Sequence, residues 1–305
     1  MNFRQLLAGI ATLACACAAS AGTTNANTSA SALGKSTDPV FQDADNGEFG
    51  TSSSASGNGA GATADASVQL GVIKLYASSF GGAGNSIGSS HADAAYLEQI
   101  TISSLGLNGT QARITVGVTV QGLIDPTGGG FGSLDFSFSA GGTTNAFLGT
   151  WGAHSNPSFP GGFPVDNVSA VAGGPLYYSG IHEVRTTITL GSAFTVLERM
   201  DLHTGKIDCA EGDLKCSFSE AGSATADFGH SSYWNGISMI ELLDPNTGSY
   251  VPADLSLFTI ASPSGLNWAQ SFAPVPEPSS LGMMALGGLL AAWRLKAGAS
   301  SRPSR

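Results

Sequence analysis

The feature that most constrains the fold of this chain is a period-two alternation of apolar and polar residues. Positions 112–120 read Ala-Arg-Ile-Thr-Val-Gly-Val-Thr-Val, and segments 134–138 and 184–190 alternate in the same way. Successive side chains of a β-strand point to opposite faces of its sheet, so this pattern predicts strands with one buried and one solvated face. Many such strands favour an all-β domain, either a β-sandwich or a jelly roll.

Further strands are predicted by shorter runs with the same character. They cover residues 68–76, 97–103, 194–201, 217–228, 237–243 and 255–261. Turns are expected at Asn108-Gly109, at 125–128 and at 244–248, where Asn, Asp, Pro and Gly combine. Within this domain a short helix is expected only at residues 91–99. The β-sandwich domain is therefore expected to span residues 66–273.

Residues 22–65 are predicted to be a flexible Gly/Ser-rich segment. The tract 50–61 reads Gly-Thr-Ser-Ser-Ser-Ala-Ser-Gly-Asn-Gly-Ala-Gly. Such a composition is typical of flexible linkers, because it offers little apolar surface to bury.

The charge balance excludes nucleic acid as a partner. The chain has 12 Lys and Arg against 22 Asp and Glu, a formal net charge of −10. Binding to phosphate backbones needs clustered cations, which this composition lacks.

The N-terminus is typical of a secretory signal peptide over residues 1–21, which we expect to be helical. Arg4 supplies a positive start, and an apolar stretch runs from Leu6 to Ala19. Ala19 and Ala21 then satisfy the small-x-small rule for cleavage, which places the first mature residue at Gly22.

The C-terminal segment 274–305 holds the most specific motif. Pro276, Glu277 and Pro278 precede an apolar run over residues 281–293, and Arg294 and Lys296 follow it. We expect a transmembrane helix here, with its basic end held in the cytoplasm. The order of a Pro-Glu-Pro motif, an apolar span and a basic cluster resembles the PEP-CTERM sorting signal of Gram-negative bacteria.

This resemblance implies a partner and a destination. Proteins with such tails are substrates of exosortases, membrane cysteine proteases that cut at or near the Pro-Glu-Pro motif. The resemblance thus implies an exported protein with a transient anchor in the inner membrane, followed by delivery to the cell surface or the extracellular matrix. It covers about 30 residues and implies nothing about the domain before them.

Two cysteines remain after removal of the signal peptide, Cys209 and Cys216. Outside the cytoplasm an isolated pair favours a disulfide, here one that staples a hairpin between the strands on either side. The alternative is a metal site that includes His203, but the cysteine spacing exceeds that of compact zinc knuckles.

The sequence favours neither a catalytic site nor a metal site. Residues 84–88 match the Gly-x-Ser-x-Gly nucleophile elbow around Ser86, but that motif needs a strand-to-helix turn, and a loop is the preferred interpretation. Residues 43–48 are acidic and could hold calcium weakly, although they miss the EF-hand pattern. No metal spacing links the five histidines, so no metal site is assigned to them: His91, His154, His182, His203 and His230.

The aromatic residues of the loops and the carboxylates of the strands leave two further hypotheses open, sugar binding and glycoside hydrolysis. The aromatics could stack on sugars, or they could fill the ends of the sandwich, which is the preferred interpretation. These residues are Trp151, Phe159, Phe163, Tyr177, Tyr178, Tyr233 and Trp234. Four carboxylates lie in predicted strands, and nothing selects a catalytic pair among them: Asp135, Glu183, Glu198 and Asp227. We therefore expect a non-catalytic structural or interaction protein of the envelope or matrix. A carbohydrate-binding module of the exopolysaccharide matrix is the first alternative, and a secreted hydrolase is the second.

Overall fold

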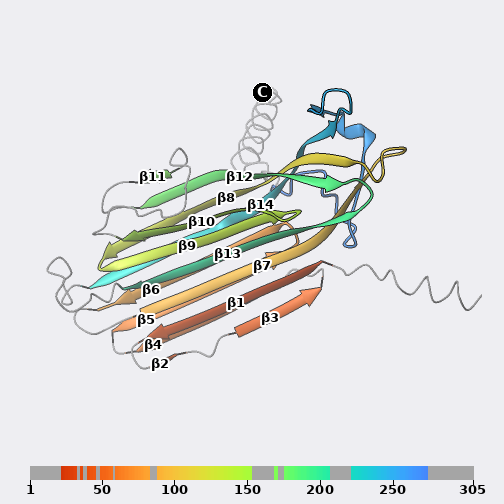
Figure 1. Cartoon of the computed structure of the whole chain (residues 1–305). Coiled ribbons are helices and arrows are strands. Elements are labelled where there is room, and N and C mark those ends of the chain that lie inside the picture. Colours follow the sequence, from red (N-terminus) through yellow and green to blue (C-terminus); the bar gives the residue numbers. More distant parts are fainter. Residues whose placement is uncertain are drawn as a thin grey trace, which may run out of the picture. The chain divides into compact units, whose positions relative to one another are not determined.

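The computed structural model describes residues 22–32, 35–36, 40–45, 49–57, 59–82, 88–152, 168–170, 175–206 and 221–273 (Figure 1). Its elements are β1 (Thr23–Ala32), β2 (Lys35–Ser36), β3 (Val40–Asp45), β4 (Phe49–Gly57), β5 (Ala60–Gln69), β6 (Val72–Gly81), β7 (Gly88–Ser103), β8 (Gln111–Gly128), β9 (Gly130–Ala140), β10 (Thr143–Gly152), β11 (Val168–Ala170), β12 (Leu176–Thr189), β13 (Ala193–Lys206), β14 (Gly222–Leu243), β15 (Tyr250–Pro252), the 3-10 turn η2 (Leu255–Leu257) and β16 (Thr259–Ala261).

These strands form two antiparallel sheets, and the predicted all-β sandwich is confirmed. The first sheet has the order β10-β9-β13-β7-β1-β2, with β3 paired to β1 and β16 paired to β7. The second sheet has the order β11-β12-β8-β14-β6-β5-β4, with β15 paired to β14. In Figure 1 the strands β9, β13, β7 and β1 lie side by side in one layer.

The predicted alternation places the core between the sheets. Along β12 buried and exposed positions alternate without a break, and along β9 every second side chain, including Phe136 and Phe138, is fully buried. Phe228 and Ile237 of β14 also lie in the core. Two tryptophans of the core are also joined to each other. The Nε1 of Trp234 donates to the carbonyl of Trp268 at 2.9 Å, and both side chains are fully buried.

The prediction of a flexible segment at 22–65 is wrong for the described residues, which form β1 to β5. The small residues that suggested a linker alternate as a strand requires: Ala60, Ala62, Ala64 and Ala66 all point into the core. Hydroxyl groups join the two sheets there, since Thr28 Oγ1 bonds to Thr51 Oγ1 at 2.8 Å and to Ser53 Oγ at 3.0 Å. Small side chains allow the sheets to approach closely at this end.

The short helix expected at 91–99 is also wrong, because these residues belong to β7. Ala92, Ala94, Tyr96 and Glu98 are all buried, which is the period of a strand. The two-residue alternation therefore outweighs the local helix propensity of this alanine-rich run.

One predicted strand and one predicted turn need correction. The expected strand 68–76 is split between β5 and β6 at Gly71, which adopts a positive φ of 80°. Conversely, residues 125–128 continue β8 instead of turning. Pro126 is tolerated because the register of β12 along β8 ends at Ile124, so its missing N–H breaks no bond on that side.

Several predictions lie outside the described residues. They concern the signal peptide with Ala19 and Ala21, the cysteines 209 and 216, Ser86 and the whole tail from residue 274. The hairpin expected around the cysteines is wrong, because β13 and β14 belong to different sheets. Within the part of the chain that the structure describes, no helix has the length and apolar character needed to cross a membrane.

Candidate functional site

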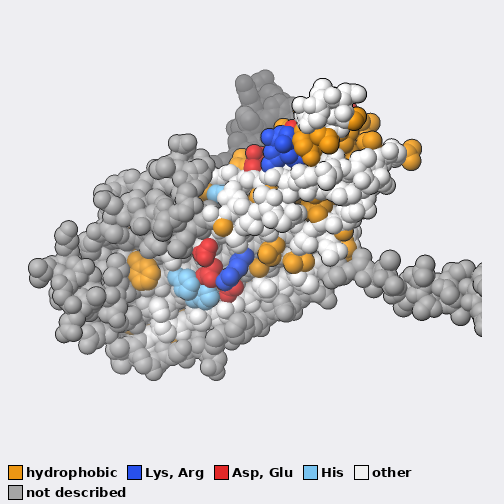
Figure 2. Space-filling view, in the orientation of Figure 1, with side chains coloured by type: hydrophobic (Ala, Val, Ile, Leu, Met, Phe, Trp, Pro, Cys, Tyr) orange, Lys and Arg blue, Asp and Glu red, His pale blue; other side chains and the backbone are white. Residues whose placement is uncertain are grey.

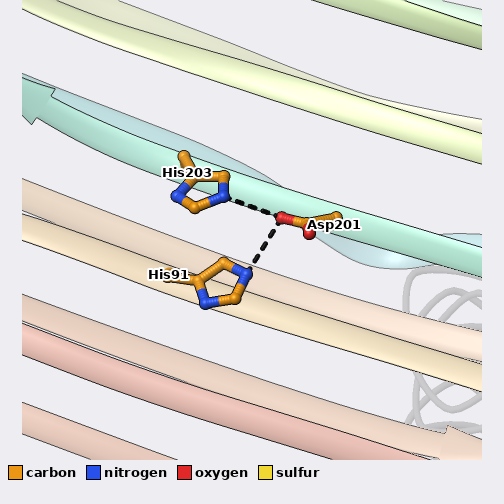
Figure 3. Close-up of side chains that lie close together, drawn as sticks. All are labelled: His91, Asp201 and His203. Carbon is orange, nitrogen blue, oxygen red and sulfur yellow. Dashed lines mark hydrogen bonds and ion pairs between the residues drawn. The ribbon is translucent and has the colours of Figure 1, made fainter.

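The first sheet carries a cluster of titratable side chains on its outer face. In the antiparallel register His203 of β13 lies directly opposite His91 of β7. Asp201 lies two residues before His203 on the same face, because the intervening Leu202 is fully buried. Figure 3 shows the two imidazoles and the carboxylate converging from these two strands.

The same register aligns three aspartates. Asp201 lies opposite Asp93 of β7 on one side and opposite Asp135 of β9 on the other. Like charges directly opposite each other on neighbouring strands are destabilising, so this row is a site that favours positive charge. We call His91, Asp93, Asp135, Asp201 and His203 the Asp201 cluster.

Asp201 is the centre of this cluster. Its Oδ1 lies 3.0 Å from Nε2 of His91 and 3.0 Å from Nε2 of His203. The two imidazole rings stack with their centroids 4.1 Å apart and an interplanar angle of 12°. Arg199 contacts the other carboxylate oxygen, Oδ2, at 3.1 Å. Figure 2 shows imidazole, carboxylate and basic side chains gathered on this face.

The electrostatics follow from these contacts. Partial burial alone would raise the pKa of Asp201, but the hydrogen bonds from His203 and His91 outweigh it and hold that pKa well below its usual range. The hydrogen bond to Asp201 raises the pKa of His91, although partial burial opposes this effect. Asp201 is therefore an ionised acceptor at neutral pH.

A pocket of about 370 Å³ opens beside the two histidines. Its walls come from β1, β7, β9 and β13, and most of its lining groups are hydroxyls. The lining residues are Ser29, Ala30, Ser31, Ser89, Ser90, His91, Phe131, His203 and Thr204. The cluster is therefore accessible from solvent on a polar surface.

Two imidazoles and a carboxylate form a donor set for a transition-metal ion. The ligating atoms of His91, Asp201 and His203 all lie within 4.8 Å of one another. Zinc binds imidazole nitrogen and carboxylate oxygen at about 2.0–2.2 Å, so modest side-chain rotations would let the three atoms share one ion. Calcium prefers oxygen ligands alone, and the imidazoles disfavour it here.

Sequence reasoning missed this site because its members come from three strands. The prediction of no metal site rested on spacing along the chain, whereas His91 meets Asp201 only through the pairing of β7 with β13. Two local signals exist, the Asp-x-His spacing of residues 201 and 203 and the His-x-Asp spacing of residues 91 and 93, and each puts both of its side chains on one face of a strand.

The other predicted site residues are dispersed or buried. Glu183 and Asp227 are exposed on the second sheet, whereas Glu198 is fully buried on the inner side of the first. His182 is a core residue that bonds to Tyr178, and burial lowers its pKa to about 4.

The loop aromatics divide in the same way. Trp234 and Tyr178 are buried, whereas Tyr177 is 55% exposed. The backbone of Asp43 and Asp45, from the calcium candidate, lies in β3. Phe159, Phe163 and His154 fall outside the described residues.

Comparison with known proteins identifies the tail. The family model of the PEP-CTERM protein-sorting motif matches residues 274–297. Neither a curated protein nor a solved structure matches the chain. The match confirms the resemblance drawn from Pro276, Glu277 and Pro278. The chain therefore carries a C-terminal PEP-CTERM protein-sorting motif, which supports export and sorting by an exosortase.

Proposed function

We propose that this exported protein is a non-catalytic structural or interaction protein of the cell envelope or extracellular matrix, and that it binds one divalent transition-metal ion at the Asp201 cluster. One observation carries the metal proposal: a single oxygen of Asp201 lies 3.0 Å from both histidines, and Asp201 itself lies between two further aspartates on the same face.

A titration of the exported chain with zinc chloride tests the metal proposal. Calorimetry should show one Zn²⁺ per chain, and the same titration with calcium chloride should show no binding. His203→Ala should weaken zinc binding at least about tenfold, since it removes one of three ligands. Glu183→Gln, an exposed change on the other sheet, serves as the control and should leave it unaltered. Absence of zinc binding, or equal affinity in His203→Ala, would contradict the proposal.

Two features support a non-catalytic role. The segment after Ser86 is the strand β7, whereas a nucleophile elbow needs a helix at that point. Asp135 and Glu198 lie on opposite sides of the first sheet, so they do not form a carboxylate pair across a sugar. Assays of the exported chain on ester and glycoside substrates should give no turnover. If some esterase activity is found, Ser86→Ala should leave it unchanged, which would exclude Ser86 as the nucleophile.

The tail is proposed to be cut at or near Pro276-Glu277-Pro278 after transient anchoring. Mass spectrometry of the mature protein from its native host should show a C-terminus close to these residues. Mature extracellular protein that still ends at Arg305 would contradict processing.

A second candidate role is binding to the exopolysaccharide of the matrix. The hydroxyl-lined pocket, whose lining includes Phe131, supports it, since sugars bind through hydroxyl contacts and aromatic faces. The exported chain should then be retained on host exopolysaccharide, and Phe131→Ala should reduce the retained fraction. Equal elution from exopolysaccharide and from a bare matrix would exclude this role.

A further inference from the structure

The beginning of β1 places Gly22 against a buried carboxylate. Thr23 lies opposite Leu97 in the register of β1 with β7, so Gly22 adjoins Glu98. Gly22 is buried, and Glu98 is fully buried. A Cβ added to Gly22 would lie 2.9 Å from Glu98 Oε2 and 2.9 Å from Leu70. The backbone of Gly22 therefore lies against this carboxylate, with no room for a side chain.

Glu98 is only half satisfied. Its Oε1 accepts a hydrogen bond from the backbone N–H of Gln99 at 2.8 Å. Its Oε2 is buried and has no hydrogen-bond partner among the described residues. A buried carboxylate oxygen without a partner is costly, so this one needs an explanation.

The sequence supplies that donor at the same place. The signal-peptide rule predicts cleavage between Ala21 and Gly22, which converts the Gly22 amide into an α-amino group. Hydrolysis of that peptide bond consumes one water and leaves a carboxylate on Ala21 and an ammonium on Gly22. An α-amino group has an ordinary pKa near 8, so it is largely cationic at neutral pH.

We propose that the α-ammonium of mature Gly22 forms a buried ion pair with Glu98, so that removal of the signal peptide completes the core at the start of β1. The ammonium has three N–H donors, and its nitrogen is bonded to the same α-carbon whose ideal Cβ position lies 2.9 Å from Oε2. The uncut chain keeps a neutral amide there and leaves Oε2 without its counter-charge.

A double-mutant cycle tests the pair in two purified forms of the exported chain. One form begins at Gly22, and the other keeps Ala21 in front of it. In the form that begins at Gly22, Glu98→Gln should lower the thermal midpoint by about 8 °C, because a buried ion pair is broken. With Ala21 retained, the same change should lower it by much less or raise it.

Glu198→Gln is the matched control, because Glu198 is equally buried on the neighbouring strand and does not adjoin Gly22. Its effect should be the same in both forms. Equal effects of Glu98→Gln in the two forms would overturn the proposal.

A second measurement keeps the proposal testable if Glu98→Gln does not fold. An amine-reactive ester should label the α-amine of folded mature protein at least about tenfold more slowly than the same amine in urea. The exposed Lys74 provides the internal reference, since its side chain should react at similar rates in both states. Equal labelling of Gly22 in the two states, or a mature N-terminus elsewhere than Gly22, would overturn it.

Discussion

The imidazole rings of His91 and His203 stack on the outer face of the first sheet, and a single oxygen of Asp201 lies 3.0 Å from Nε2 of each. Neighbouring strands supply Asp93 and Asp135 in the same row as Asp201. An acidic row beside two imidazoles suits a cation, because the three carboxylates repel one another although His91, His203 and Arg199 stabilise Asp201.

Replacing Asp135 by Asn should have opposite effects on stability and on metal binding. Without metal, the free energy of unfolding should rise by roughly 0.2–1 kcal/mol, because one like-charge neighbour of Asp201 is removed. Zinc affinity should fall, since the local negative charge is smaller.

Chemical denaturation at low and high salt checks this prediction. The stabilisation should shrink in 1 M salt, where exposed charges are screened. Asp227→Asn, an exposed change on the other sheet, is the control and should show neither effect. A lower metal-free stability in Asp135→Asn would contradict the account of the acidic row.

Some strands can be predicted from consecutive residues alone, whereas others depend on the sheet that faces them. The alternation in β8, β9 and β12 is written in consecutive residues, so these strands could be predicted. The strands β1, β4 and most of β5 are missed because their inward residues are mostly alanine, serine and threonine, whose composition is that of a linker. Only the facing sheet shows that residues such as Ala64 and Thr28 are buried.

The candidate site was missed for a related reason. Which residues meet across a sheet depends on strand order and register, and one residue of slippage would move His91 to the other face. The sequence holds the Asp201-x-His203 spacing but not the pairing of β13 with both β7 and β9. Of the three clustered aspartates, only Asp135 is among the carboxylates that the sequence offers as catalytic candidates.

Glu198 should make the protein less stable as the pH rises. It lies fully buried beside Tyr96 of β7 and Ser232 of β14, and burial raises its pKa to about 7 although both neighbours act in the opposite direction. Below pH 4.5 the carboxyl is protonated in both states, so its full contribution is present there. As the pH rises through 7, the unfolded chain ionises more readily and that contribution is lost, on the order of 3 kcal/mol.

Unfolding of Glu198→Gln as a function of pH checks this sign. The variant should match the unmodified chain near pH 4 and exceed its free energy of unfolding at pH 8. A variant that loses stability at pH 8 would show that Glu198 is stabilised in its ionised form.

His182 should act in the opposite direction in almost the same pH window. Burial lowers its pKa from 6.5 to about 4, so the unfolded chain binds a proton more readily. Its contribution is complete above pH 6.5 and is lost as the pH falls through 4, again on the order of 3 kcal/mol. Between about pH 4.5 and 6.5 the effects of His182 and Glu198 oppose each other.

His182→Gln tests this compensation, since it keeps a polar group beside Tyr178 and removes the titration. Its stability should fall steadily with rising pH across this window, whereas Glu198→Gln should gain stability there. Parallel pH profiles for the two variants would contradict the assignment of these groups.

The segment before the sorting motif should be essential for stability. Trp268 is fully buried and packs edge-on against two aromatic rings. Its ring centroid lies 5.1 Å from that of Trp234 and 5.2 Å from that of Phe272. The backbone N–H of Phe272 donates to the carbonyl of Trp234 at 2.8 Å, so the chain is held to the core up to two residues before position 274. Trp268→Ala should cost about 3–5 kcal/mol, because it removes a large core side chain and leaves a cavity.

Thermal unfolding checks this cost against Leu257→Ala, which truncates a side chain that is 59% exposed in the same part of the chain. The control should change stability by no more than about 0.5 kcal/mol. If Trp268→Ala changes stability as little as the control, residues 262–273 are not part of the core. The folded domain would then end near β16, which would leave a longer connection to the Pro-Glu-Pro motif at residues 276–278.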